Sequence, residues 1–123
     1  MLVYIDDIQL YRDVVKNIFE SKGISAMTFS SPDDFCDALD RKEISLSDIK
    51  YLVCDYHFPA NNLDDIDFVS HIRQTRNYKG YVGILTVMDE VEYDSSLVDN
   101  VIPKDMIGEK LFSLVVQNSK KPV

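Results

Sequence analysis

A short apolar run, Tyr-Leu-Val-Cys at 51–54, ends at the carboxylate of Asp55. An uninterrupted apolar run bounded by polar residues is typical of a strand that is buried on both faces. Strands of this kind belong to parallel sheets with helices on each side. In open α/β sheets, ligands and chemistry collect at the carboxyl ends of the strands. We therefore expect Asp55 to lie at the functional edge of a parallel sheet.

Four further apolar runs are expected to be strands, and helical patterns separate the runs from one another. The expected strands are 2–5, 24–29, 51–55, 81–85 and 97–102. Helices are expected at about 10–19, 31–39, 64–76 and 105–118, with a loop at 41–48 and at most a short helix in the acidic segment 88–96. This alternation implies right-handed crossovers and a sheet covered on both faces. For five strands it predicts a doubly wound, flavodoxin-like parallel sheet of order 2-1-3-4-5.

Two local signals mark helix ends. Gly23 follows the first helical pattern and is expected to cap its C-terminus, because glycine adopts the left-handed conformation without strain. Ser31 precedes Pro32, so Ser31 is expected to be the N-cap of the second helix, with the proline in its first turn.

Length and charge restrict the class of protein. The 123 residues are enough for one domain, expected over 1–119, with 120–123 as a frayed end or the start of a linker. The net charge of −8 argues against direct nucleic acid binding, which requires basic residues against phosphates. We expect no signal peptide, and no apolar run approaches the length needed to span a membrane. Cys36 and Cys54 fit neither a disulfide framework nor a metal site, and Cys54 is expected to be a buried strand residue. A cytoplasmic protein is expected.

Five polar residues follow four of the expected strands. The pair Asp6 and Asp7 follows the first strand, Asp55 ends the third, Thr86 ends the fourth and Lys104 follows the fifth. Three carboxylates in one crevice repel one another unless a cation is present, and Mg²⁺ prefers oxygen ligands. A carboxylate beside Mg²⁺ can accept a phosphoryl group, with a hydroxyl and an ammonium group on the phosphoryl oxygens. The set therefore predicts phosphoryl transfer to Asp55, assisted by Thr86 and Lys104.

Each of these residues also has an ordinary explanation when it is taken alone. The pair Asp6 and Asp7 suits the start of a helix, where carboxylates contact free N–H groups. Asp55 could be a turn residue, Thr86 reflects β propensity, and a single lysine is usually a solvated charge. The functional interpretation depends on all five residues meeting at one edge of the sheet.

The chain resembles, over essentially its full length, the receiver domains of two-component response regulators. In this resemblance Asp55 is the phosphoacceptor, and Asp6 and Asp7 are the acid pair that holds Mg²⁺, with Asp7 the direct ligand. Thr86 matches the switch hydroxyl and Lys104 the phosphate-binding lysine. The resemblance implies a signalling switch in a phosphorelay rather than a turnover enzyme.

The resemblance extends to the loop after the acceptor and to partners. Pro59 matches the proline four positions after the acceptor, and His57 lies where the family uses a backbone carbonyl as a metal ligand. The implied partners are a sensor histidine kinase or histidine phosphotransfer protein as phosphoryl donor, and an output domain or downstream protein. The resemblance implies no membrane association and leaves homodimerisation open.

Several positions depart from the family pattern. The loop after the acceptor is about two residues longer, with Asp65 near a usual glycine. Val87 replaces a small residue after the switch hydroxyl, and Asp105 replaces the usual proline after the lysine. Val101 stands where the family has an aromatic switch residue, and the stretch from 86 to 104 is about four residues shorter, which predicts a shortened fourth helix. We therefore expect a receiver that signals by an altered route, such as loop ordering.

Three other interpretations remain. A pseudo-receiver would keep the fold but act only as a phosphorylation-independent interaction module, as the departures would allow. A haloacid-dehalogenase-type phosphatase also uses an aspartate nucleophile and Mg²⁺, but it needs a second aspartate two residues after the first, and Ile8 follows the acid pair here. Flavodoxin-like cofactor binding lacks a phosphate-cradling loop after the first strand, where acids would repel phosphate.

The remaining aromatic residues and histidine have simpler explanations. Phe19, Phe29, Phe68 and Phe112 are expected in the core. His71 is expected on a helix surface, exposed to solvent. It is not expected to bind a metal, because no second nitrogen or sulfur ligand lies at metal spacing.

Overall fold

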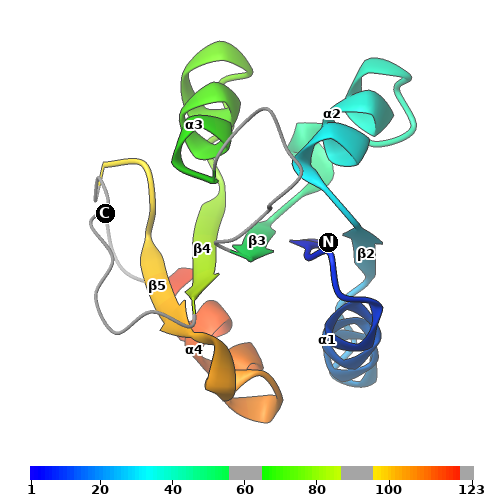
Figure 1. The fold of residues 1–123 in the computed structure, drawn as a ribbon, viewed down its shortest axis with the longest axis vertical. Helices are drawn as coiled ribbons and strands as arrows, with labels where there is room; N and C mark the ends of the chain where they lie inside the picture. Colours follow the sequence, from blue (N-terminus) through cyan, green and yellow to red (C-terminus); the bar gives the residue numbers. More distant parts are fainter. Residues whose placement is uncertain (56–64, 87–95, 120–123) are drawn as a thin grey trace.

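The computed structural model describes residues 1–55, 65–86 and 96–119. Its strands are β1 (Leu2–Ile5), β2 (Ala26–Phe29), β3 (Tyr51–Asp55), β4 (Tyr81–Thr86) and β5 (Asn100–Pro103). They form one parallel sheet in the order β2-β1-β3-β4-β5, which confirms the predicted doubly wound arrangement. Figure 1 shows this sheet between two pairs of helices.

The helices cover both faces of the sheet. They are α1 (Gln9–Ser21), α2 (Pro32–Asp40), α3 (Asp65–Ser70) and α4 (Glu109–Ser119). Two 3₁₀ turns, η1 (Leu46–Asp48) and η3 (Lys104–Met106), and a π-helical segment, η2 (His71–Thr75), complete the regular structure of the described residues. In Figure 1, α1 and α4 lie on one side of the sheet and α2 and α3 on the other. The helix expected at 64–76 corresponds to α3 continued by η2.

Two hydrophobic cores fill the space between sheet and helices. Side chains alternate along a strand, so each strand contributes to both faces. The core under α2 and α3 includes Val3, Ile5, Phe35, Phe68 and Ile72. The core under α1 and α4 includes Leu2, Tyr4, Phe19, Leu111 and Val115.

Both predicted caps are confirmed. The N–H of Gly23 bonds to the carbonyl of Glu20 and the N–H of Ile24 bonds to the carbonyl of Phe19, the pattern of a Schellman motif. Gly23 has a φ of +83°, which a residue with a side chain adopts only with strain. The hydroxyl of Ser31 accepts a hydrogen bond from the N–H of Asp34 at 3.1 Å.

Three elements begin later than the sequence predicts, and the first is β2, which starts at Ala26 rather than at 24. Strand β5 starts at Asn100 rather than near 97, and the residues before it are held by Arg73, which donates to the Leu97 carbonyl and the Asp99 carboxylate. Helix α4 starts at Glu109 rather than near 105, because Gly108 has a φ of +137° and separates η3 from the helix. The segment 41–48, expected to be a loop, contains η1.

The predictions for individual buried residues are mostly confirmed. Cys54, Phe19 and Phe68 are fully buried, while Phe29 and Phe112 pack at the margins of the two cores and stay partly exposed. The prediction for His71 was wrong in part, because its ring is half-buried and its Nε2 accepts a hydrogen bond from Arg76 at 3.0 Å. Within the described part of the chain, none of the helices has the length and apolar character needed to span a membrane.

Candidate functional site

The strand register brings the predicted residues to one edge of the sheet. Ile5 of β1 pairs with Cys54 of β3, so the next residues, Asp6 and Asp55, lie side by side at the carboxyl ends of the two central strands. Asp55 in turn pairs with Leu85 of β4, whose next residue is Thr86.

Thr86 and Lys104 complete this edge. Thr86 pairs with Pro103 of β5, and Lys104 follows immediately as the first residue of η3. Thr86 is buried, with 4% of its surface exposed, at the end of β4. Topology alone therefore places the hydroxyl and the lysine beside the acids, as predicted.

Asp6 is fully buried and held from several directions. Its Oδ1 accepts a hydrogen bond from the backbone N–H of Ile8 at 2.9 Å. Its Oδ2 accepts one from the hydroxyl of Tyr4 at 2.5 Å. Its backbone carbonyl accepts a third from the Arg12 guanidinium at 2.7 Å, which ties the first turn of α1 to the end of β1. The orientation of the Asp6 carboxylate is thus fixed by its surroundings.

Lys104 reaches from η3 into the acidic group. Its Nζ lies 2.8 Å from Oδ2 of Asp55 and 3.3 Å from Oδ2 of Asp6. The same nitrogen lies 4.5 Å from the centre of the Tyr11 ring, a cation–π distance. Burial lowers the pKa of the Lys104 ammonium, but its hydrogen bond to Asp55 and the charges of Asp55 and Asp6 outweigh burial and raise that pKa. Lys104 is therefore charged at neutral pH.

Three carboxylates lie close together at this edge, and the ammonium group of Lys104 contacts two of them. Asp6, Asp7 and Asp55 each offer one oxygen, and these atoms all lie within 4.8 Å of one another. Asp7 is exposed, whereas Asp6 and Asp55 are buried. Like charges at this distance repel one another, and a divalent cation relieves the repulsion. The ligand set contains only oxygen atoms, which suits Mg²⁺. The residues present therefore fit a magnesium ion.

Other predicted positions have less structural support. His57, Pro59, Val87 and the shortened fourth helix fall outside the described residues. Val101 lies in β5, is half-buried, and packs against the core under α2 and α3. The individual roles of the acceptor, the metal ligands and the switch residues stay predictions.

Three further residues contact the site and were not identified from the sequence. The contact of Tyr4 with Asp6 could have been predicted from the sequence. Residues two apart in a strand share a face, and Tyr4 precedes Asp6 by two positions. Burial raises the pKa of Tyr4, an effect that its hydrogen bond to Asp6 reinforces. Tyr11 and Arg12 have no comparable signal, because their contacts depend on where α1 starts relative to β1.

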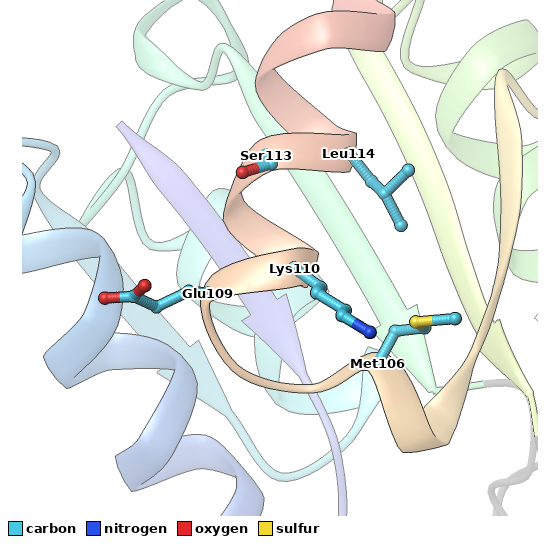
Figure 2. Close-up of a pocket in the computed structure, with 5 residues that line it drawn as sticks. All are labelled: Met106, Glu109, Lys110, Ser113 and Leu114. Atoms are coloured by element: carbon cyan, nitrogen blue, oxygen red, sulfur yellow. The ribbon is translucent and has the colours of Figure 1, made fainter.

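A separate hollow lies along the last helix. Figure 2 shows this pocket, which has a volume of about 490 Å³. It is lined by Met106, Glu109, Lys110, Ser113 and Leu114. None of the three clustered acids lines it, so this pocket is distinct from the site at the edge of the sheet.

Comparison with known proteins identifies the fold. No protein-family model matches the chain. No curated protein matches it either. Solved structures do match: the chemotaxis response regulator CheY4 of Vibrio cholerae is 16% identical, with 95% of this chain and 96% of that chain covered and a TM-score of 0.78. The receiver domain of the Francisella response regulator 1452 is 21% identical, with 97% and 95% covered and a TM-score of 0.77.

A third similar structure was determined with a metal ion. The response regulator TrrA of Thermotoga maritima, in complex with Mg²⁺-BeF, is 15% identical, with 95% of this chain and 96% of that chain covered and a TM-score of 0.75. At these identities the likeness shows the fold alone. The protein has the CheY-like fold of response regulator receiver domains.

Proposed function

We propose that the protein is a response regulator receiver domain that accepts a phosphoryl group on Asp55 with the help of Mg²⁺. The observation that carries this proposal is the contact of Lys104 with Asp55 at 2.8 Å, inside a cluster of three carboxylates at the carboxyl edge of the sheet. Equal numbers of acidic and basic groups would suit a structural role, whereas an excess of acids beside a lysine suits a cation and a phosphoryl group.

The chemical step assigns a role to each residue. A carboxylate oxygen of Asp55 attacks phosphorus of a phosphohistidine, and the P–N bond breaks with its electron pair remaining on the imidazole nitrogen. Lys104 pairs with the phosphoryl oxygens, and the hydroxyl of Thr86 donates to one of them. Asp6, Asp7 and Asp55 would hold Mg²⁺, with the backbone carbonyl of residue 57 as a further ligand. The chemistry that Mg²⁺ supplies when bound is neutralisation of charge on the phosphoryl oxygens.

The modification acts as a switch rather than as a step of a turnover enzyme. A phosphoryl group adds about −1.5 to −2 charges at neutral pH. This charge draws Lys104 and Thr86 inward and biases the loops that follow β4 and β5. The donor is a sensor histidine kinase or a histidine phosphotransfer protein in the cytoplasm, and the receiver of the signal is an output domain or a downstream protein. Because Val101 is aliphatic and packs toward α2 and α3, we propose a relay without an aromatic switch residue.

The test is the intact mass of the protein after incubation with acetyl phosphate, with and without Mg²⁺. We expect a gain of one phosphoryl group that requires Mg²⁺ and that is lost in Asp55→Asn. Asp48→Asn is the matched control, because it removes an exposed aspartate of η1 and should leave the gain intact. If the native chain gains no mass and also fails to bind beryllofluoride with Mg²⁺, the protein is an interaction module without phosphoacceptor chemistry.

A further inference from the structure

The hydrogen bond between Tyr4 and Asp6 is a buried feature of the site that the proposed chemistry does not use. Both side chains are fully buried: Tyr4 lies in β1 and belongs to the core under α1 and α4, and Asp6 is the first residue after Ile5, the end of that strand. The oxygen–oxygen distance of 2.5 Å is typical of a hydroxyl that donates to a charged carboxylate.

This bond adds to two other donors on the same carboxylate. Oδ2 of Asp6 receives the Tyr4 hydroxyl and lies 3.3 Å from Nζ of Lys104, while Oδ1 receives the N–H of Ile8. An ionised carboxylate has about four acceptor positions, and three donors already surround this one. Each donor withdraws negative charge from the oxygens that a cation would bind. Asp7, by contrast, is exposed.

We propose that Tyr4 is a positioning residue that holds the Asp6 carboxylate toward Lys104 and weakens its hold on the cation, leaving Mg²⁺ chiefly to Asp7 and Asp55. The inference rests on the proposed function, because it concerns the same metal site. The resemblance already implies that Asp7 is the direct ligand. The new assignment is that Asp6, held by Tyr4, sets the position of the lysine. Tyr4 thereby limits how tightly the unphosphorylated protein holds Mg²⁺.

The test compares Mg²⁺ binding by the native chain and by Tyr4→Phe, which removes one hydroxyl and keeps the ring. Isothermal titration with MgCl₂ should give a Kd that is about threefold to tenfold lower in Tyr4→Phe, the change expected when the net contribution of one typical hydrogen bond no longer opposes cation binding. Tyr81→Phe is the matched control: Tyr81 is buried in the same core but starts β4 at the opposite edge of the sheet. Its loss of a hydroxyl should leave the Kd unchanged.

A second background shows whether the effect passes through Asp6. In Asp6→Asn, adding Tyr4→Phe should no longer change the Kd for Mg²⁺, because the carboxylate that Tyr4 positions is gone. A purely structural effect of the tyrosine would persist in this background and would overturn the proposal.

The native chain offers a readout that needs no variant. The hydroxyl proton of Tyr4, buried against a carboxylate, should give a slowly exchanging proton resonance that remains when Mg²⁺ is added. Disappearance of this signal on Mg²⁺ binding would mean that Asp6 turns to the metal, and the proposal would be wrong.

The outcomes separate the two proposals. Equal or weaker Mg²⁺ binding by folded Tyr4→Phe overturns the role of Tyr4 and leaves the proposed function standing. Absence of Mg²⁺ binding by the native chain overturns both.

Discussion

Arg73 lies where β4 and β5 begin and Lys104 lies where they end, and the contacts of these two basic side chains differ in charge balance. At the amino edge, Arg73 of η2 donates to the backbone carbonyls of Leu97, Tyr78 and Gly80. It also forms a salt bridge of 3.0 Å to the carboxylate of Asp99 and lies 5.4 Å from the centre of the Tyr78 ring. That carboxylate also accepts the N–H of Val82 at 2.8 Å.

At the carboxyl edge, Lys104 contacts two carboxylates and a third lies close by. Arg73 thus meets one acid and neutral carbonyls, whereas Lys104 meets an excess of acid. In the Arg73 network the positive and negative charges are equal in number, so it needs no ligand. It holds together the residues that precede β4 and β5. An unmatched network stores electrostatic repulsion that a cation or a phosphoryl group can use. The number of acids for each basic group therefore distinguishes the structural contacts of Arg73, which we call the Arg73 joint, from the candidate site around Lys104.

The largest expected change in the free energy of unfolding comes from removing the guanidinium of Arg73. Arg73→Met should lower the free energy of unfolding by at least about 3 kcal/mol, because three part-buried backbone carbonyls lose their donor at a cost of about 1 kcal/mol or more each. Urea unfolding followed by circular dichroism measures this change. Lys79→Met, an exposed lysine in the same segment, should change stability by less than about 0.5 kcal/mol. An equally small change in Arg73→Met would mean that the contacts of Arg73 do not stabilise the sheet.

A smaller change in the free energy of unfolding is expected when Mg²⁺ binds to the acidic cluster. Mg²⁺ at 100 times its Kd should raise the free energy of unfolding by about 2.7 kcal/mol, through binding to the folded state alone. The increase should vanish in Asp7→Asn and should persist in Lys79→Met. Urea unfolding with and without MgCl₂ measures it. Stabilisation of Asp7→Asn to the same extent would show that the cation binds elsewhere.

A graded effect is expected at alkaline pH. The pKa of Lys104 is raised above its ordinary value of 10.5 and that of Tyr4 above 10.0. A raised pKa means that the folded state binds more protons, so the stability it contributes is present below the ordinary value and is lost as pH rises through the folded-state value. Unfolding free energies measured from about pH 9 to about pH 11 should therefore fall. The fall should be smaller in Lys104→Met, and an identical fall would exclude Lys104 as a contributor.

The smallest change in the free energy of unfolding is expected at an exposed salt bridge, which serves as a reference for the other three predictions. Lys22 and Glu109 form a salt bridge of 3.6 Å between α1 and α4, and their side chains are 40% and 81% exposed. Glu109→Gln should change the free energy of unfolding by less than about 0.5 kcal/mol, because solvent screens exposed pairs. A larger change in thermal or urea unfolding would mean that exposed pairs also contribute to the stability of this fold, and the contrast between the two edges would weaken.

Much of the fold was predictable, because its signals are local. The apolar runs and helical spacings yield the strand order, and Gly23 and Ser31 mark helix ends by their own chemistry. The starts of β5 and α4 were misplaced for a different reason. They depend on Arg73, which lies 26 residues before Asp99, and on the backbone conformation of Gly108. Neither is visible in a hydrophobic pattern.

The site was predictable to the extent that topology determines it. Asp6, Asp55 and Lys104 meet because parallel strands end at a common edge. The hydrogen bonds that orient Asp6 were missed, since they require the side-chain positions of Tyr4 and Arg12. The alternation of β1 already places Tyr4 on the same face as Asp6, so this contact could have been anticipated.

The position of Lys104 late in the chain has a consequence for biosynthesis. The acids enter the growing chain at positions 6, 7 and 55, and the ammonium group that contacts two of them follows 49 residues after Asp55. Until β5 pairs with β4, a nascent chain contains the repelling carboxylates without their counter-charge. Closure of the site and docking of the last strand are thus one event, and a chain whose fifth strand has not docked lacks the lysine at its acceptor.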